Sequence, residues 1–472
     1  MMQRFEPGSI IDGFVLEQRL PSGGMAEIWR ASHPSVAGPL VLKIPFLDPG
    51  QDVSVIVGYE VEELILKRLS GPHVPRFVNA GPLDQIPYLA MEWVAGTSLA
   101  DTVATAPLPA EEVATIGIAI AVALADVHRQ GVAHLDLKPQ NIIIAERGAV
   151  LLDFGLARHA ELPDLFGAES SGPMGSAAYM APEQVLGDRS DPASDLFALG
   201  CILYQLATGE EPFGRPATLA GLKRRLYHDP RPPRAVNPAV PAWLEEIIMR
   251  CLEVDRGRRY GEAGKIAFDL RHPDQVVLTR RRGQRAPAGF WQRLLALFQK
   301  RDERQLLGMP EAGQRRAGPG LVLTAVDLSV GPDALAAAVR AETARLLAAR
   351  QDSWLACLTV LKTELIAETK YADETGRSLY IGRLVALKDW ARSLQLPEER
   401  VSYHVIEVVS AADAILRYAE HNDVDHIVLG ARSSSALRRH LGSVSSKVVA
   451  EAQCSVSVVR MKSGGAPDAG AP

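Results

Sequence analysis

The sequence predicts two folded domains: a mixed α and β domain over residues 10–270, and an α/β domain with a doubly wound parallel sheet over residues 320–462. The length of 472 residues suits two or three domains better than one. Strand-like and helix-like patterns mix in the first region, whereas after Leu321 they alternate strictly, as in a parallel sheet with helices on both faces. Residues 271–319 are basic and interrupted by Pro and Gly, which indicates a linker.

Composition excludes several classes of protein. Charged residues make up 23% of the chain and hydrophobic residues 47%, which is typical of a globular protein and not of a disordered one. The formal net charge of −5 gives no reason to expect nucleic-acid binding. The N-terminus lacks the pattern of a secretory signal, and no apolar run reaches the roughly 18 residues of a spanning helix, so we expect a cytoplasmic protein. Four scattered cysteines are expected to be reduced thiols and not metal ligands.

One segment of the linker is amphipathic. From Gly289 to Glu303 the sequence GFWQRLLALFQKRDE places most of its apolar residues on one face of a helix. A basic amphipathic helix of this kind can lie on a membrane surface, and the alternative is that it packs on a flanking domain. The last residues, 463–472, are small and polar, and we expect them to be disordered.

The residues that indicate chemistry lie in VAHLDLKPQNIII and in LLDFGLA, which follows it closely. Short loops beside buried strands hold polar groups rigidly. Asp136 would accept or orient the proton of an attacking hydroxyl, and Lys138 would neutralise charge on a transferred phosphate. Asn141 and Asp153 supply the oxygen ligands that Mg²⁺ prefers when it bridges nucleotide phosphates.

This ordered set resembles the signature of the protein-kinase family. The resemblance covers about 260 residues and implies an α+β bilobal protein-kinase fold that uses ATP with Mg²⁺ or Mn²⁺ and phosphorylates Ser or Thr of protein substrates. Lys138 and Ser176 fit the serine/threonine branch, and the motifs SGGMAE and YMAPEQ are closest to bacterial regulatory kinases.

Upstream, the resemblance implies the nucleotide site. Lys43 in LVLKI matches the lysine that contacts the α and β phosphates, and among three nearby glutamates we expect Glu62 to be its partner. Pro21 and Ala26 stand where the family usually has the first and third glycines of its phosphate loop, and Met91 is the expected gatekeeper. The expected ATP-binding residues are Leu20, Pro21, Ser22, Gly23, Gly24, Ile28, Lys43, Met91, Glu92 and Val94.

Downstream, the resemblance implies three architectural residues. Glu183 in the APE motif should form a buried ion pair with Arg259, and Asp195 should brace the catalytic loop from a central buried helix. A further helix from Glu111 to Arg129 carries an apolar stripe expected in the core: Val113, Ile116, Ile120, Leu124 and Val127.

Leu135 departs from the family pattern. Many kinases carry arginine before the catalytic aspartate, and that arginine pairs with a phosphate on the activation loop. Leucine cannot do this. We therefore expect activity that does not depend strongly on phosphorylation of Ser170 or Ser171.

The strand–helix order of the C-terminal region resembles the universal stress protein family. The segment GARSSSALRRHLGSVSSKVV is similar to that family's nucleotide loop, although Ser433 replaces its second glycine and the spacer is one residue shorter. The resemblance implies nucleotide contacts from Asp327, Gly430, Gly442, Ser443 and Ser445, and a homodimer formed through the last strand, Ser455 to Val459. The alternative is a related fold that no longer binds ATP.

Two functional hypotheses from different classes follow. The first is an active kinase controlled by a stress-protein-like sensor, which could respond to adenine nucleotides. The second is a pseudokinase scaffold that binds nucleotide without transferring phosphate, for which Pro21, Ala26 and Leu135 speak. Lys43, Glu62, Asp136, Lys138, Asn141 and Asp153 are all present, which favours the active enzyme.

Overall fold

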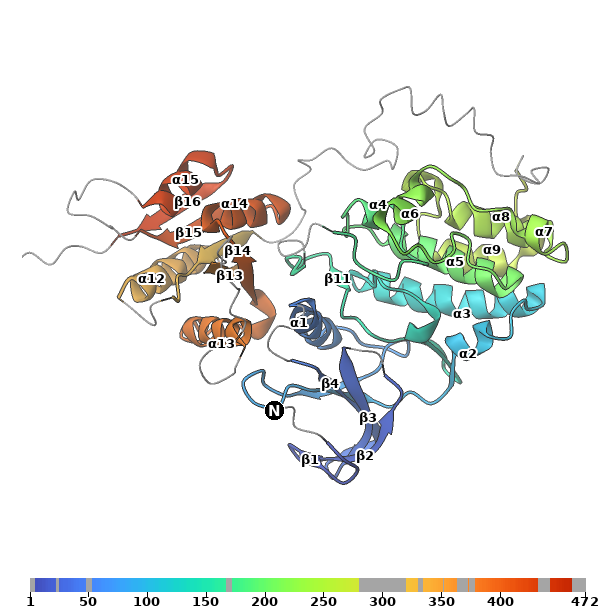
Figure 1. Ribbon diagram of the computed structural model, residues 1–472, viewed down its shortest axis with the longest axis horizontal. Coiled ribbons are helices and arrows are strands. Elements are labelled where there is room, and N and C mark those ends of the chain that lie inside the picture. Colours follow the sequence, from blue (N-terminus) through green and yellow to red (C-terminus); the bar gives the residue numbers. More distant parts are fainter. Residues whose placement is uncertain are drawn as a thin grey trace, which may run out of the picture. The chain divides into compact units, whose positions relative to one another are not determined.

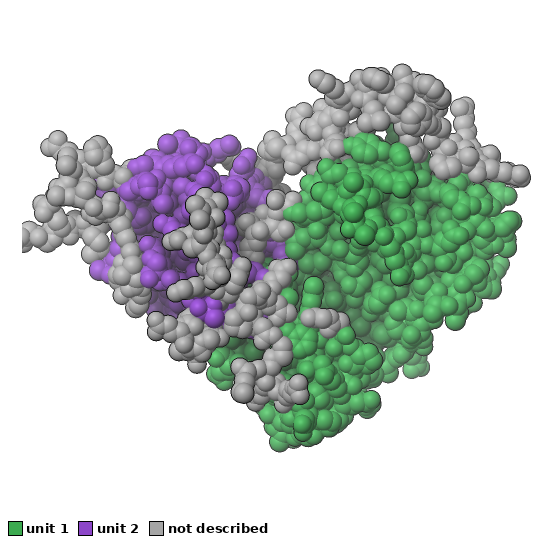
Figure 2. All heavy atoms as spheres, in the orientation of Figure 1, with its two compact units in different colours: residues 1–46, 54–162, 171–314 green, residues 47–53, 163–170, 315–472 purple. Residues whose placement is uncertain are grey.

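The computed structural model describes residues 5–22, 25–47, 53–166, 172–279, 320–329, 334–350, 352–362, 372, 378–431 and 442–460. The chain forms two compact units, shown in two colours in Figure 2. The first comprises residues 1–46, 54–162 and 171–314, and the second comprises residues 315–472 with two short stretches, 47–53 and 163–170.

The first unit begins with an antiparallel sheet of six strands in the order β1-β2-β3-β4-β6-β5. Strands β1 to β4 of this sheet are labelled in Figure 1. The strands are β1 Ile10–Ile11, β2 Phe14–Leu20, β3 Ala26–His33, β4 Val36–Pro45, β5 Phe77–Ala80 and β6 Leu89–Glu92. Helix α1, Ser54–Leu66, follows β4 in the chain. Alternating side chains of β2 to β4 are buried, among them Leu16, Trp29 and Leu42, so one face of this sheet carries its core.

The rest of the first unit is mainly helical. Its helices are α2 Leu99–Val103, α3 Ala110–Arg129, α4 Pro182–Val185, α5 Ala193–Thr208, α6 Leu219–Lys223, α7 Pro233–Val236, α8 Ala242–Cys251 and α9 Ala263–Arg271. Among the described residues, single turns of 3₁₀-helix are η1 Pro139–Asn141, η2 Arg224–Leu226, η3 Arg256–Arg258 and η4 Pro273–Gln275. Short strands are β7 Thr97–Ser98, β8 Val132–Ala133, β9 Ile142–Ala145, β10 Gly148–Leu151 and β11 Arg158–His159.

Two helices form the centre of this part. Every residue of α5 from Ser194 to Thr208 is buried, which makes it a core helix. Helix α3 packs against α5 and α9, and the whole apolar stripe predicted from the sequence is buried: Val113, Ile116, Ile120, Leu124 and Val127. These packed helices are a rigid base for the loops between β8 and β10.

The second unit is a five-stranded parallel sheet in the order β14-β13-β12-β15-β16. Its strands are β12 Leu321–Ala325, β13 Trp354–Lys362, β14 Val401–Val408, β15 His426–Gly430 and β16 Ser455–Val459. In the described part of this unit the helices are α12 Ala334–Ala349, α13 Leu379–Arg392, α14 Ala411–His421 and α15 Ser443–Glu451, and η6 Glu398–Arg400 is a 3₁₀ turn.

Helices cover both faces of this sheet. Residues of α12 and α13, such as Val339 and Leu387, pack with Val322 on one face. Residues of α14 and α15, such as Tyr418 and Val448, pack with Leu323 on the other. The doubly wound parallel sheet predicted from the sequence is confirmed.

Within the part of the chain that the structure describes, no helix is both long and apolar enough to cross a membrane. The amphipathic linker segment, Gly289 to Glu303, and the tail after residue 460 lie outside the described residues.

Candidate active site

Lys43 joins three separate segments of the first unit. It lies on β4, opposite Ile28 of β3. Its Nζ is 2.6 Å from Oε2 of Glu62 on α1 and 2.8 Å from Oδ1 of Asp153, which follows β10. Of the three candidate glutamates, the structure thus brings Glu62 to the lysine. Glu63 pairs instead with Lys67 at the helix surface.

Burial and charge set the protonation of this cluster. Burial alone would lower the pKa of Lys43, but the charges of Asp153 and Glu62 outweigh it and raise that pKa above its usual value. The charge of Lys43 lowers the pKa of Asp153 to about 2. Burial raises the pKa of Glu62, and the nearby lysine offsets part of that effect. The cluster therefore keeps Lys43 charged and Asp153 ionised at neutral pH.

The loop between β8 and β9 holds Asp136 between two donors. Its Oδ1 accepts the backbone N–H of Ser176 at 2.7 Å, and its Oδ2 is 2.7 Å from Nζ of Lys138. The amide nitrogen of Asn141, at the end of η1, donates to the carbonyl of Asp136 at 3.0 Å. That bond commits the nitrogen of Asn141 and leaves its carbonyl oxygen as the metal-binding atom. These three residues therefore share one small hydrogen-bonded loop.

Asp195, on α5, stabilises this loop through its buried carboxylate. Its two carboxylate oxygens accept the backbone N–H groups of His134 and Leu135, each at 2.8 Å, and His128 binds the same carboxylate at 2.8 Å. Burial would raise the pKa of Asp195, but these hydrogen bonds and the nearby imidazoles lower it. Leu135 has a left-handed backbone (φ 62°), which leucine rarely adopts. The two hydrogen bonds from the backbone N–H groups to Asp195 hold that turn in place.

Glu183 and Arg259 form a buried, bidentate ion pair. The two carboxylate oxygens lie 2.7 Å from Nη1 and Nη2, and both side chains are almost fully buried. Ser194 Oγ also donates to Glu183. Burial would raise the pKa of Glu183, but the charge and hydrogen bonds of Arg259 lower it. The pair thus fixes α4 to the chain after η3.

In the second unit, the candidate nucleotide residues fall at the carboxyl ends of the two adjacent strands β12 and β15. Asp327 follows β12, where its Oδ1 accepts from the backbone and hydroxyl of Ser329. Gly430 ends β15, and a Cβ there would lie 3.0 Å from Leu335 of α12. Gly442 caps the N-terminus of α15, whose first residue, Ser443, is exposed. Ser445 is buried and donates its hydroxyl to the carbonyl of Gly442.

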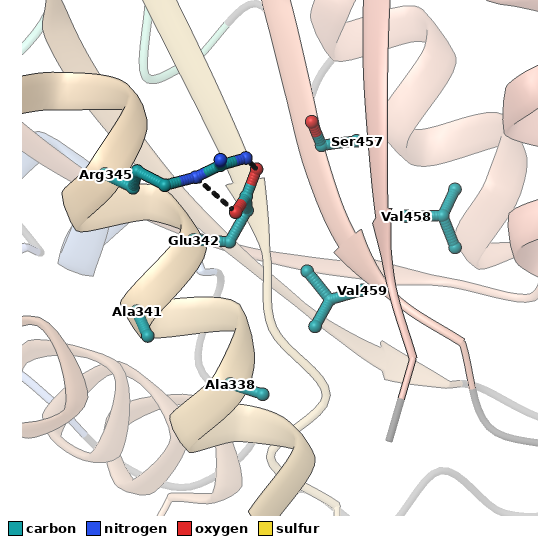
Figure 3. Close-up of a pocket in the computed structure, with 7 residues that line it drawn as sticks. All are labelled: Ala338, Ala341, Glu342, Arg345, Ser457, Val458 and Val459. Atoms are coloured by element: carbon teal, nitrogen blue, oxygen red, sulfur yellow. Dashed lines mark hydrogen bonds and ion pairs between the residues drawn. The ribbon is translucent and has the colours of Figure 1, made fainter. Parts of the chain in front are cut away.

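A shallow pocket of about 470 Å³ lies elsewhere in this unit, between α12 and the edge strand β16 (Figure 3). Its walls are small or apolar except for Ser457 and the Glu342–Arg345 ion pair, whose atoms are 2.8 Å apart. Three residues of β16 line the pocket, and one of them, Val459, pairs with Gly430 at the end of β15.

Comparison with known proteins identifies both parts of the chain. The protein kinase domain model matches residues 14–270, more than half of the chain. The chain belongs to the protein kinase family. The model of the universal stress protein family matches residues 321–460, so a universal stress protein domain follows the kinase domain.

Similar proteins are bacterial serine/threonine kinases. The chain is 32% identical over 259 residues to the probable serine/threonine-protein kinase CPE1738 of Clostridium perfringens, covering 54% of this chain and 38% of that protein. It is 30% identical over 270 residues to serine/threonine-protein kinase PknB of Mycobacterium tuberculosis, covering 56% and 43%. This chain thus spans about two fifths of the length of these relatives. A crystal structure of the M. tuberculosis PknI kinase domain is 25% identical, with a TM-score of 0.46, over 58% of this chain and all of that one.

The kinase domain presents its expected nucleotide residues from β2, β3 and β6. Leu20 ends β2, Pro21 and Ser22 follow it, and Ile28 lies on β3, whereas Gly23 and Gly24 lie outside the described residues. Met91 and Glu92 close β6, and Val94 comes two residues later.

Both the side chain and the backbone N–H of Glu92 already form bonds within the domain. Its carboxylate binds Arg147 at 2.9 Å, and its N–H donates to the carbonyl of Arg76. Its backbone carbonyl is therefore the group that we expect an adenine to use.

The donor set suits Mg²⁺ carried in with a nucleotide. No cluster of three His, Cys, Asp or Glu side chains able to hold a metal alone occurs in the described part of the chain. Mg²⁺ usually binds through one or two protein oxygens plus substrate phosphates, and the ionised Asp153 and the oxygen of Asn141 are such ligands. The Asp153 side chain is 42% exposed, so it is open to a ligand on one side.

Sequence reasoning missed two supporting residues. Gln184 accepts the N–H of Ala181 and donates to the carbonyl of Leu135 at 2.8 Å, which links the APE motif to the catalytic loop. His128 binds Asp195 from the end of α3. Gln184 directly follows a recognised motif and could have been noticed. A histidine at the end of an amphipathic helix gives no such signal.

Proposed function

We propose that this chain is an active, ATP-dependent serine/threonine kinase. The observation that carries the proposal is the cluster in which Lys43 binds both Glu62 and Asp153, because three segments far apart in sequence combine to hold one cation between two carboxylates. Asp136 and Lys138 form a second pair in the same domain. Phosphoryl transfer depends mainly on such positioned charges.

In the proposed reaction, the hydroxyl oxygen of a substrate Ser or Thr forms a bond to the γ-phosphorus of ATP. The bond from that phosphorus to the β–γ bridging oxygen breaks, and ADP leaves. Asp136 takes the hydroxyl proton, and Lys138 and Lys43 stabilise negative charge on the phosphates. Bound Mg²⁺, held by Asn141 and Asp153, would neutralise further phosphate charge.

Labelled ATP tests this proposal directly. The full chain and its Asp136→Asn variant are incubated with ATP and Mg²⁺, and incorporation of label is measured. We expect label in the wild type and a loss of at least about 10²-fold in the variant. Equal incorporation in both would contradict the active-kinase proposal.

The second candidate function is a nucleotide-binding pseudokinase scaffold. Pro21 in the phosphate loop favours it, because proline lacks the N–H that a glycine would offer to phosphate. Nucleotide binding by a chain whose wild type incorporates no label would establish the scaffold instead.

We propose that the activity of the kinase does not depend strongly on activation-loop phosphorylation. Leu135 is buried and apolar, and it offers no charge to a phosphate. Ser170 and Ser171 lie outside the described residues. Phosphatase treatment should leave activity largely unchanged. Loss of activity that is restored by re-phosphorylation at these serines would refute this.

We propose that the universal stress protein domain regulates the kinase and that adenine nucleotides are its signal. Asp327, Gly430 and the backbone amides of Gly442 and Ser443 at the start of α15 support a phosphate-binding role, whereas the buried Ser445 supports the α15 cap. Titration with AMP of wild type and of a Gly442→Pro variant tests it. A lack of AMP binding by the wild type, or equal binding by both, would remove this regulatory site.

We also propose a homodimer through β16. This strand is at the sheet edge, and three of its residues, Ser457 to Val459, line the pocket of Figure 3. Ser457→Lys would place like charges at the centre of a two-fold strand pairing, whereas Ser457→Ala would not. Sedimentation should show a monomer only for the lysine variant. A wild-type monomer, or a dimer in all three proteins, would count against this interface.

The cytoplasmic location stays a prediction.

A further inference from the structure

Arg225, on η2, is one of the largest fully buried side chains of the protein. Its guanidinium donates to three backbone carbonyls, those of Met180, Ala177 and Leu222. It also lies over the ring of Phe213, 5.2 Å from the centroid. A buried guanidinium is normally paired with a carboxylate. In the described part of the chain no acidic side chain is paired with Arg225, so carbonyl dipoles and an aromatic face stabilise its charge.

Two of those carbonyls belong to one short segment, residues 176–181. The segment is tied at other points as well. The N–H of Ser176 binds the carboxylate of Asp136, and Tyr179 donates its hydroxyl to Gln205 of α5 at 2.7 Å. A chain whose hydroxyl reaches Asp136 must therefore pass beside this segment. The two guanidinium N–H groups of Arg225 that donate to Met180 and Ala177 constrain the backbone of this segment.

We propose that Arg225 is a positioning residue for the protein substrate, and that it acts by fixing residues 176–181 beside Asp136. The inference rests on the proposed kinase activity. A planar guanidinium can reach two carbonyls three residues apart, whereas the ammonium of lysine is a single point donor. The nucleotide contacts assigned to Lys43 and Asp153 come from other segments. Arg225 should therefore affect the protein substrate and not ATP.

The test compares Arg225→Lys with Arg224→Lys, an exposed neighbour on the same turn, in the full chain. Steady-state rates are measured with myelin basic protein as the probe substrate and with ATP varied separately. For Arg225→Lys we expect KM for the protein probe to rise about tenfold, the effect of one lost charge-assisted hydrogen bond, with KM for ATP changed less than about twofold. Arg224→Lys should match the wild type.

Amide hydrogen exchange gives a second readout. The N–H groups of Tyr179 and Met180 donate to the carbonyl of Ser176, and both should exchange faster in Arg225→Lys. If Arg225→Lys does not fold, Phe213→Leu provides a second variant. It keeps the guanidinium of Arg225 and removes the aromatic ring beside it, and it should raise the KM for the protein probe to a smaller extent.

The possible failures differ from each other. Unchanged KM for the probe in an active Arg225→Lys protein, or equal rises in both KM values, would overturn the role of Arg225 alone. A wild type that phosphorylates nothing would overturn the proposed kinase activity and this role with it.

Discussion

At the scale of single residues, the site depends on which of several like side chains is buried. Glu62 and Glu63 are neighbours on α1, but Glu62 is buried against Lys43, whereas Glu63 faces Lys67 at the surface. An ion pair at the surface contributes little, while a pair inside a site orients the groups that contact substrate. Two adjacent glutamates should therefore have very different effects on function.

Glu62→Gln is expected to reduce phosphoryl transfer by about 10²-fold, because Lys43 loses the partner that holds it beside the phosphates. Glu63→Gln is the matched control and should stay within about twofold of wild type. Incorporation of labelled phosphate measures both. Similar losses in the two variants would show that the helix as a whole, and not the Glu62 contact, matters.

The residue scale is also where the sequence patterns were most informative. Asp136, Lys138, Asn141 and Asp153 were predictable because their order and spacing carry chemical meaning, and the structure gathers them around one loop and one cluster. His128 and Arg225 were not, because each acts on backbone or carboxylate groups that only the fold brings near. A contact between two residues that lie far apart in the sequence leaves no motif in the sequence around either of them.

At the scale of elements, buried polar contacts connect helices and turns that are separated in the sequence. The Glu183–Arg259 pair connects α4 with the turn after η3, and Ser194 brings in α5. Element order and the parallel sheet were predictable from periodicity. The attachment of α4 was expected only through family resemblance, since a single Glu and a single Arg 76 positions apart form no pattern.

Glu183→Gln should destabilise the kinase domain by about 3–5 kcal/mol, because it leaves Arg259 charged, buried and without a carboxylate. Arg258→Gln, at an exposed neighbour that is paired with Asp255, should change stability by less than about 1 kcal/mol. Chemical denaturation of the full chain measures both. A small effect of Glu183→Gln would mean that water or nearby carbonyls compensate the charge.

Between β14 and α14 of the stress-protein domain, a buried histidine predicts a pH dependence. Burial lowers the pKa of His404 to about 3 from 6.5, and Tyr418 and Ser402 bind its Nε2. Between those values the unfolded state binds a proton that the folded state does not. Stability is therefore complete above pH 6.5 and falls as pH decreases toward 3, by at most about 1.4 kcal/mol per pH unit.

Calorimetry of the full chain from pH 7 to pH 5 tests this. The midpoint of the stress-protein domain should fall with pH, and His404→Gln should flatten that slope. His426, whose pKa is also lowered by burial, would leave part of it. An identical slope in both proteins would assign the pH dependence to other groups.

At the scale of the whole molecule, each compact unit has its own core, so we expect two unfolding transitions. ATP with Mg²⁺ at about 100 times its Kd should stabilise the kinase transition by about 2.7 kcal/mol. Calorimetry with and without nucleotide measures the shift. A shift of the second transition as well would reveal nucleotide in the stress-protein domain, and no shift in either would contradict ATP binding.

Leu135 has a consequence for how such a protein can change over evolutionary time. Its backbone N–H binds Asp195 and its carbonyl accepts from Gln184, while its side chain contributes to neither bond. The loop is thus held by atoms that every amino acid except proline possesses. The side chain at this position can therefore change in evolution without loss of these two hydrogen bonds, where the new residue tolerates the left-handed backbone.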